Sequence, residues 1–258
     1  MSGFFAPPDV HAPAGLFGAS HLVLFTLAAL LIWGACRASR RLDAHGVRRV
    51  IRAATLALWV SEGVKIAFVL LVVRTRNPNE YVPLYYCSIT LYAGLFSSLS
   101  RGVWRRVGDA FLATGGLVGG AVFLCVPLTS LSRYPAWHFI SLHSFFLHAL
   151  MVYLGLLLFQ SGVYRARARD ILYNGGLVSV TCAVALWFNA RYDALHPDAP
   201  LANLMFISKD FPGTPISLVY HLCGPLYSVV AWLGQAFLPF LAVYAVQRAI
   251  LSRRAKRG

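Results

Sequence analysis

Charged residues are scarce in this chain: 12% of its 258 residues are charged, whereas 58% are hydrophobic. Because soluble domains carry about 25% charged residues, this composition excludes an ordinary aqueous domain and indicates a membrane protein. The first fifteen residues have neither a basic segment nor a small-residue cleavage site, so we expect the first apolar run to be retained as a span. No long polar stretch interrupts the apolar runs, which predicts one integral membrane domain over residues 1–258.

Paired cysteine motifs are also missing. The five cysteines are an odd number, none forms a CxxC pair, and all lie in or at the ends of apolar runs. This pattern argues against a disulfide framework and a zinc site, and we expect neither a metal nor a cofactor. The net charge of +14 comes from basic residues placed between apolar runs. Because they do not gather on one face of a domain, nucleic acid is not an expected partner.

Apolar runs of about twenty residues recur along the whole chain. They predict an all-α, polytopic membrane helix bundle with seven transmembrane helices. Most of the 23 Lys and Arg residues follow the odd-numbered spans, which places the N-terminus outside and the C-terminus in the cytoplasm. The predicted spans are residues 16–36, 51–74, 84–100, 109–127, 137–160, 170–189 and 218–247.

Two further segments bear on how the bundle is closed. Gly115, Gly116, Gly119 and Gly120 form two overlapping GxxxG pairs in the fourth span, a spacing that lets helix backbones approach closely in lipid. We expect them to pack inside the bundle rather than to form a dimer face. The loop 190–217 mixes apolar residues with prolines, which predicts that it folds back onto the membrane surface or caps a cavity.

Ionisable residues inside the predicted spans mark candidate sites, because they are costly in hydrocarbon unless they are paired. Glu62 and Lys65 lie three residues apart on one helical face. They form a salt bridge, or Glu62 orients a histidine or a substrate head group. Cys87 opens the third span beside Tyr85 and Tyr86. A cysteine becomes a nucleophile only beside an imidazole or positive charge, and the other four cysteines are interpreted as small hydrophobic side chains.

Three histidines, His138, His143 and His148, follow one another at intervals of five residues in the fifth span. Successive members point about 140° apart on a helix, so they cannot all face one cavity. His21, near the outer end of the first span, could hold a haem only together with one of them on the facing helix. Hydrogen-bonded packing is the commoner role of a histidine in a membrane helix.

Four features follow one another along the chain: Glu62, PLYYC (residues 83–87), SFFLH (residues 144–148) and the NLMFIS…GPLY string that begins at Asn203. In this order they resemble the YwaF-type integral membrane proteins of bacteria and their eukaryotic relatives, the transmembrane protein 164 family. The resemblance implies a lipid acyltransferase in the bacterial cytoplasmic membrane. Cys87 matches the family's cysteine and His148 its histidine. The resemblance extends from His21 to about Tyr227.

The implied reaction moves a fatty acyl chain between membrane phospholipids through a thioester on Cys87, with a lysophospholipid as the acceptor. His148 is the first candidate for the base. His143, which is closer to Cys87 in depth, is the second, and Glu62 is expected to orient the imidazole. The substrate-binding residues are expected around a cavity between spans one, two, three and five: Glu62, Tyr85, Tyr86, His21 and Asn203.

Two other functions fit the same sequence. A non-enzymatic transporter or receptor would have the same topology, although we find no internal repeat of the kind that transporters often contain. A lipid hydrolase would use the same cysteine and histidine, with water in place of the lysophospholipid.

Overall fold

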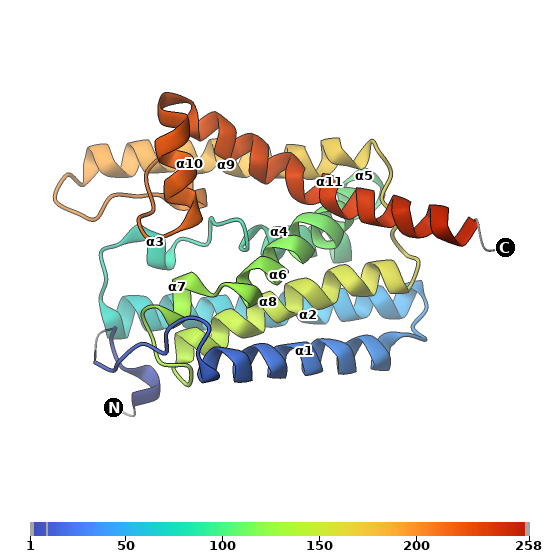
Figure 1. Cartoon of the computed structure of the whole chain (residues 1–258), viewed down its shortest axis with the longest axis horizontal. Helices are drawn as coiled ribbons and strands as arrows, with labels where there is room; N and C mark the ends of the chain where they lie inside the picture. The colour runs from blue at the N-terminus through green and yellow to red at the C-terminus, as the bar shows by residue number, and fades with distance from the viewer. Residues whose placement is uncertain (1–2, 9, 256–258) are drawn as a thin grey trace.

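A computed structural model describes residues 3–8 and 10–255, and within these residues the chain is helical and contains no strand. The long helices run along one axis, and the two termini lie at opposite ends of the bundle (Figure 1). Six helices of the described part are long and apolar enough to cross a membrane. These are α1 (Ala19–Ser39); α2 (Ala44–Phe68) with its π-helical extension η2 (Val69–Val73); α5 (Gly102–Phe111), η3 (Leu112–Gly116) and α6 (Leu117–Cys125) in continuous succession; α8 (Phe139–Gln160); α9 (Asp170–Leu195); and α10 (Pro215–Cys223), η5 (Gly224–Leu226) and α11 (Tyr227–Ala255).

The predicted third span, residues 84–100, is not a full transmembrane helix, and a count of seven such helices is therefore not confirmed. The short α3 (Pro78–Tyr81) is followed by irregular chain, and α4 (Ile89–Leu99) has only 11 residues. Its length of about 16 Å is roughly half of the bilayer core. Pro83 explains the break, because proline lacks an N–H donor and pushes the preceding residue out of the helical region. Val82 is accordingly extended.

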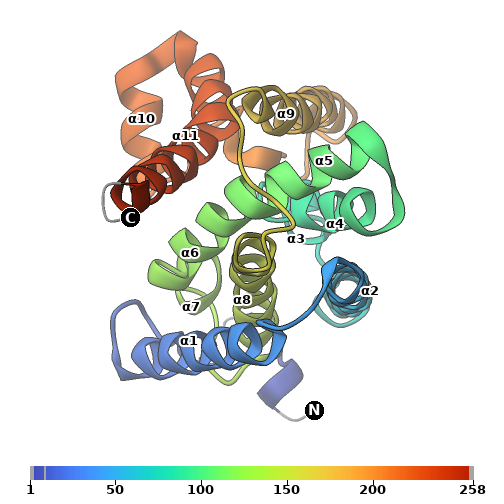
Figure 2. The same ribbon diagram turned by 90° about the vertical axis from the view of Figure 1, so that its right-hand side faces the viewer.

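Helix α8 is the centre of the bundle. Figure 2 shows it between α1, α2 and the α5–α6 helix, and it packs against all of them. Helix α4 fills the space between α2 and α5. Three small elements connect the helices at their ends: η1 (Gly3–Phe5), α7 (Leu128–Leu131) and η4 (Leu204–Phe206).

The glycines of the fourth span pack inside the bundle, as the sequence predicted. A Cβ on Gly115 would lie 2.6 Å from the Tyr86 hydroxyl, and one on Gly119 would lie 3.1 Å from the ring of Tyr86. A Cβ on Gly120 would lie 2.8 Å from the His148 carbonyl oxygen of α8. These glycines therefore make room for an aromatic ring and for a neighbouring helix backbone.

Two buried ion pairs join the helices near the C-terminal ends of α4 and α8. Arg48 of α2 donates from both terminal nitrogens to Asp109 of α5, at 2.5 and 2.7 Å, and Ser97 of α4 donates to the same carboxylate at 2.6 Å. Arg106 binds Asp170 of α9 in the same two-pronged manner. Each acid is thereby neutralised, which burial of a carboxylate requires.

The loop after α9 folds inward and caps the bundle, in agreement with the prediction for residues 190–217. Leu204, Met205 and Ile207 are fully buried in the main hydrophobic cluster. Met205 and Phe206 both have positive φ angles, of 60° and 48°, which is uncommon for bulky residues. Their carbonyl oxygens accept hydrogen bonds from α11, where the donors are Gln235 and Tyr227, respectively.

Candidate functional site

The candidate site lies beside a layer of leucines contributed by three helices. Leu58 of α2, Leu91 of α4 and Leu147 of α8 are buried together with Met151. Cys87 packs against the same cluster. The thiol therefore lies where these three helices meet.

One helical turn from this layer is a second layer that is chemically different. Helix α2 runs opposite to α4 and α8 (Figure 1). Four residues after Leu58 and four residues before Leu147 therefore lead toward the same end of the bundle, by about 6 Å, and the position four residues before Leu91 lies in the turn that precedes α4. The residues at those positions are Glu62, Cys87 and His143. The fold thus brings the carboxylate of Glu62 to the imidazole of His143 and near enough to the Cys87 thiol to act on it electrostatically, although the three residues are far apart in sequence.

Glu62 connects two basic side chains in this layer. One carboxylate oxygen accepts a 2.5 Å hydrogen bond from Lys65 Nζ, and the other lies 3.5 Å from His143 Nε2. Glu62 and His143 are both buried, with exposures of 2% and 8%. The salt bridge and the carboxylate–histidine contact, which the sequence left as alternatives, therefore occur together.

The tautomer of His143 follows from this contact. Its Nε2 is buried and, within the described residues, has no hydrogen-bond partner of good geometry. A lone pair facing the Glu62 carboxylate would be repelled, whereas an N–H would be attracted. The neutral ring should therefore carry its hydrogen on Nε2, which leaves the lone pair on Nδ1 free to accept a proton.

Cys87 is partly exposed, whereas Glu62 and His143 are buried. The charges of Glu62 and Lys65 both act on its sulfur, and the Ser88 hydroxyl lies beside it. Cys87 also stands at the start of α4, where the Thr90 N–H donates to the Cys87 carbonyl oxygen at 3.1 Å. The two charges act on the sulfur in opposite directions, because a carboxylate opposes the thiolate form of a cysteine and a nearby ammonium group favours it.

His148 is arranged differently from His143. Its Nδ1–H donates to the Ser144 carbonyl oxygen at 2.7 Å, and its ring stacks on Phe123 of α6 with 3.6 Å between centroids. The ring is thus held against α6, while Glu62 contacts His143. Both histidines have one free ring nitrogen in principle, but only His143 has a carboxylate to stabilise its charged form.

The other two histidines have no free ring nitrogen. His21 Nδ1 accepts from the Phe17 N–H at 3.2 Å, so Nε2–H donates to the Leu124 carbonyl oxygen at 3.0 Å. His138 caps α8 by accepting from the Ile140 N–H, and its Nε2 binds the Ala6 carbonyl oxygen. Neither ring can bind a haem iron without losing these bonds, and His21 lies on α1, away from the Glu62–His143 contact.

The tyrosines next to Cys87 point to different parts of the bundle. Tyr85 contacts Phe206 of the capping loop, with 5.0 Å between ring centroids, and its hydroxyl interacts electrostatically with Cys87. Tyr86 points into the α5–α6 helix beside Phe111. Of the two, Tyr85 is the one whose hydroxyl is close enough to Cys87 to interact with it.

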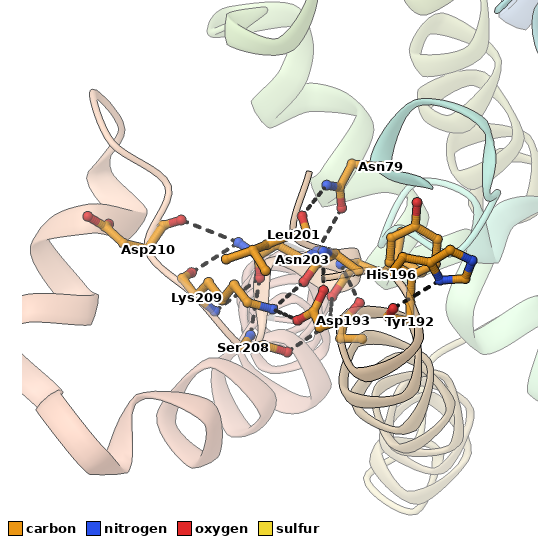
Figure 3. Close-up of polar contacts among 12 residues, drawn as sticks. Asn79, Tyr192, Asp193, His196, Leu201, Asn203, Ser208, Lys209 and Asp210 are labelled. Carbon is orange, nitrogen blue, oxygen red and sulfur yellow. Dashed lines mark hydrogen bonds and ion pairs between the residues drawn. The ribbon is translucent and has the colours of Figure 1, made fainter. Parts of the chain in front are cut away.

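Asn203 organises the capping loop (Figure 3). Its side-chain oxygen accepts from the N–H groups of Ser208 and Lys209, and its side-chain nitrogen donates to the carbonyl oxygens of Lys209 and Asp210. Its own N–H donates to Asn79 Oδ1 at 2.7 Å. The whole amide is engaged within the protein, so Asn203 shapes the loop above the site.

Sequence reasoning overlooked Ser88 and Trp59. Trp59 packs against the same leucine layer as Cys87, and its Nε1–H donates to the Leu91 carbonyl oxygen at 3.3 Å. The available signal was spacing, since Trp59 precedes Glu62 by three residues and Ser88 follows Cys87 directly. Within residues 3–8 and 10–255, no group of three His, Cys, Asp or Glu side chains is arranged to hold a metal ion.

Comparison with known proteins agrees with the membrane architecture. The family model described as "TMEM164 family" matches residues 16–245 of this chain. That range contains the candidate site and all six long apolar helices except the end of the last one. Comparisons with curated proteins and with solved structures return no match.

Proposed function

The chain belongs to the TMEM164 family, and from this membership and the intramembrane cluster we propose that it is a lipid acyltransferase of the bacterial cytoplasmic membrane. It would move a fatty acyl chain from a phospholipid to a lysophospholipid through a thioester on Cys87. The observation that carries the proposal is that the buried carboxylate of Glu62 contacts His143 and also acts electrostatically on the Cys87 thiol. A carboxylate, an imidazole and a thiol in this order form the arrangement by which cysteine nucleophiles are activated.

The first half of the reaction forms the thioester. His143 Nδ1 accepts the thiol proton, and Cys87 Sγ attacks the carbonyl carbon of the phospholipid ester. The tetrahedral oxyanion collapses with cleavage of the ester C–O bond, and the departing lysophospholipid oxygen takes the proton from the imidazolium. Glu62 stabilises that imidazolium through Nε2–H.

The second half returns the enzyme to its starting state. A lysophospholipid hydroxyl gives its proton to His143 and attacks the thioester carbonyl carbon, and the thiolate of Cys87 leaves and is protonated again. The developing oxyanion lies near the start of α4, where the helix N-terminus and the Ser88 hydroxyl offer stabilisation. Lys65 adds a positive charge that Glu62 holds in place at 2.5 Å.

Burial of the cluster favours transfer over hydrolysis. Glu62 and His143 are almost fully buried, and the neighbouring layer consists of leucines and a methionine. Such surroundings exclude bulk water and admit a lipid hydroxyl that is delivered with its own apolar chains. A transporter remains the competing function, because an irregular half-helix inside a span is also typical of transporters.

The substitution Cys87→Ala, which removes the thiol, tests the proposal. Membranes of cells that express the wild-type protein are compared by lipidomics with membranes containing Cys87→Ala at equal protein level. Cys125→Ala is the matched control, because Cys125 is exposed at the end of α6 and lies outside the cluster. We expect the acyl-chain distribution of phospholipids to change for Cys87→Ala only. Identical distributions in all three membranes would refute the acyltransferase and leave the transporter.

A further inference from the structure

A shallow groove of about 460 Å³ runs between α2 and α4 on the outer surface of the bundle. Almost all of its surface is apolar. On α2 the lining residues follow the helical spacing of one face, and on α4 they do the same. The groove is lined by Arg52, Thr55, Leu56 and Trp59 of α2 and by Leu95, Ser98 and Leu99 of α4.

The floor of the groove is apolar although it contains two hydroxyl residues. Thr55 Oγ1 donates to the Ile51 carbonyl oxygen at 2.7 Å, and Ser98 Oγ donates to the Gly94 carbonyl oxygen at 2.7 Å. Both hydroxyls are therefore satisfied within their own helices. The surface that remains matches a hydrocarbon chain and offers no partner to a polar ligand.

One end of the groove is strongly basic. Arg52 donates to the Ser98 carbonyl oxygen at 3.0 Å, which fixes its guanidinium at the groove's mouth. Arg49 lies one turn earlier on α2, and Arg101 lies two residues after the end of α4. All three side chains are exposed, and among the described residues none of them forms a salt bridge. Three positive charges at this end are thus without an acidic partner.

The length of the groove fits one leaflet of a bilayer. Arg52 and Trp59 are seven residues apart, which is about 10 Å along α2, and half of the hydrocarbon core is about 15 Å thick. A lipid whose phosphate contacts Arg52 would therefore extend one acyl chain along Leu56 and Leu95 as far as Trp59. Trp59 packs against the leucine layer that also holds Cys87.

We propose that this groove binds an anionic phospholipid of the leaflet at the basic end of the bundle, with its phosphate at Arg52 and one acyl chain between α2 and α4. The positive-inside pattern predicts that this leaflet is the cytoplasmic one. Clusters of arginine next to membrane helices attract anionic head groups. The apolar groove provides what a surface charge alone does not, namely a fixed position for the chain.

A photoactivatable phosphatidylglycerol with a diazirine in the middle of one chain tests the proposal. The purified full-length protein is reconstituted in phosphatidylcholine nanodiscs that contain this probe, and the labelled peptides are identified by mass spectrometry. We expect labelling concentrated on residues 52–59 and 95–99. Excess unlabelled phosphatidylglycerol should reduce this labelling by competition. The phosphatidylcholine of the nanodisc, which already surrounds the protein, should not prevent it.

Two kinds of variant separate the contribution of the Arg52 charge from that of the groove that holds the acyl chain. Arg52→Gln should lower the labelling about fivefold, whereas Arg52→Lys keeps the charge and should retain most of it. Leu95→Trp fills the groove and should abolish labelling at residues 52–59. The controls are Arg40→Gln, which removes an arginine at the same end of α1, and Leu31→Trp, which adds a ring to the exposed face of α1.

Labelling spread evenly over the exposed helices, or unchanged in Arg52→Gln and Leu95→Trp, would mean annular lipid only and would overturn the proposal. The thermal stability of each variant provides a second measurement. Phosphatidylglycerol should raise the unfolding temperature of the wild type, Arg52→Lys and both controls. The same rise in Arg52→Gln and Leu95→Trp would also contradict the proposal. Every measurement is made without acyl transfer, so its outcome does not depend on the proposed enzyme activity.

Discussion

Replacement of each histidine by phenylalanine will decide which of them serves as the base. Phenylalanine keeps an aromatic ring of similar shape and removes both ring nitrogens. His143→Phe should lower acyl transfer by about 10²–10⁴-fold, the usual contribution of a positioned general base. His148→Phe keeps the stacking on Phe123 and should change the rate by less than about tenfold, because the ring of His148 is held against α6.

The contact between Glu62 and His143 determines how far the rate of acyl transfer should fall in Glu62→Gln. At 3.5 Å and an effective dielectric constant of about 20, a carboxylate stabilises an imidazolium by about 5 kcal/mol. Lys65, which binds the same carboxylate at 2.5 Å, cancels part of this stabilisation. We therefore expect Glu62→Gln to lower the rate by about 10²-fold, less than its full Coulomb energy would give and within the range of general-base effects.

The assay measures transfer of a fluorescent acyl chain from phosphatidylcholine to lysophosphatidylethanolamine in proteoliposomes. A chloroacetamide reagent, applied in parallel, reports the reactivity of the Cys87 thiol without any lipid substrate. Both rates should fall together in His143→Phe and Glu62→Gln. Loss of both rates in His148→Phe, with His143→Phe close to wild type, would refute the role of His143 and give His148 the function that the family resemblance implies.

Two further predictions concern stability rather than catalysis. Arg48→Ala leaves the buried carboxylate of Asp109 without its arginine partner and should destabilise the fold by about 3–5 kcal/mol. In thermal unfolding, the double variant Arg48→Met with Asp109→Leu should recover most of this loss. Failure to recover would contradict the ion-pair explanation. Asn203→Ala removes the four side-chain hydrogen bonds that organise the capping loop, each worth about 1 kcal/mol. The rate of hydrogen exchange of residues 203–210 should rise, while that of α8 stays unchanged. Equal exchange rates in wild type and variant would show that other contacts hold the loop.

Most of the fold follows from the sequence because apolar length is what a transmembrane helix requires. The exception, residues 84–100, is instructive. Its composition is as apolar as that of the other runs, and a count of hydrophobic residues does not distinguish a helix from buried irregular chain. Pro83 was visible in the sequence, but the consequence of that proline depends on whether the neighbouring helices α2 and α5 cover the exposed backbone groups.

The site was only partly predictable for a similar reason. The spacing of Glu62 and Lys65 fixes their pairing, since both lie on one helix. The angle between His143 and His148 is also fixed by helical geometry, but the histidine that faces α2 depends on the rotation of α8 about its own axis. That rotation is set by packing, for example by Gly120 against the backbone of α8, and no local sequence signal reports it.

The contact between Glu62 and His143 bears on the proposed mechanism. A Glu–Lys pair on one helix already neutralises both charges, so the contact from His143 on another helix is not needed to bury the carboxylate. A neutral imidazole gains little at 3.5 Å from a carboxylate that Lys65 already shares. An imidazolium gains much more, and it would form only while the thiol of Cys87 gives up its proton. In the proposed mechanism, the contact with Glu62 would therefore stabilise the imidazolium more than it stabilises the neutral ring.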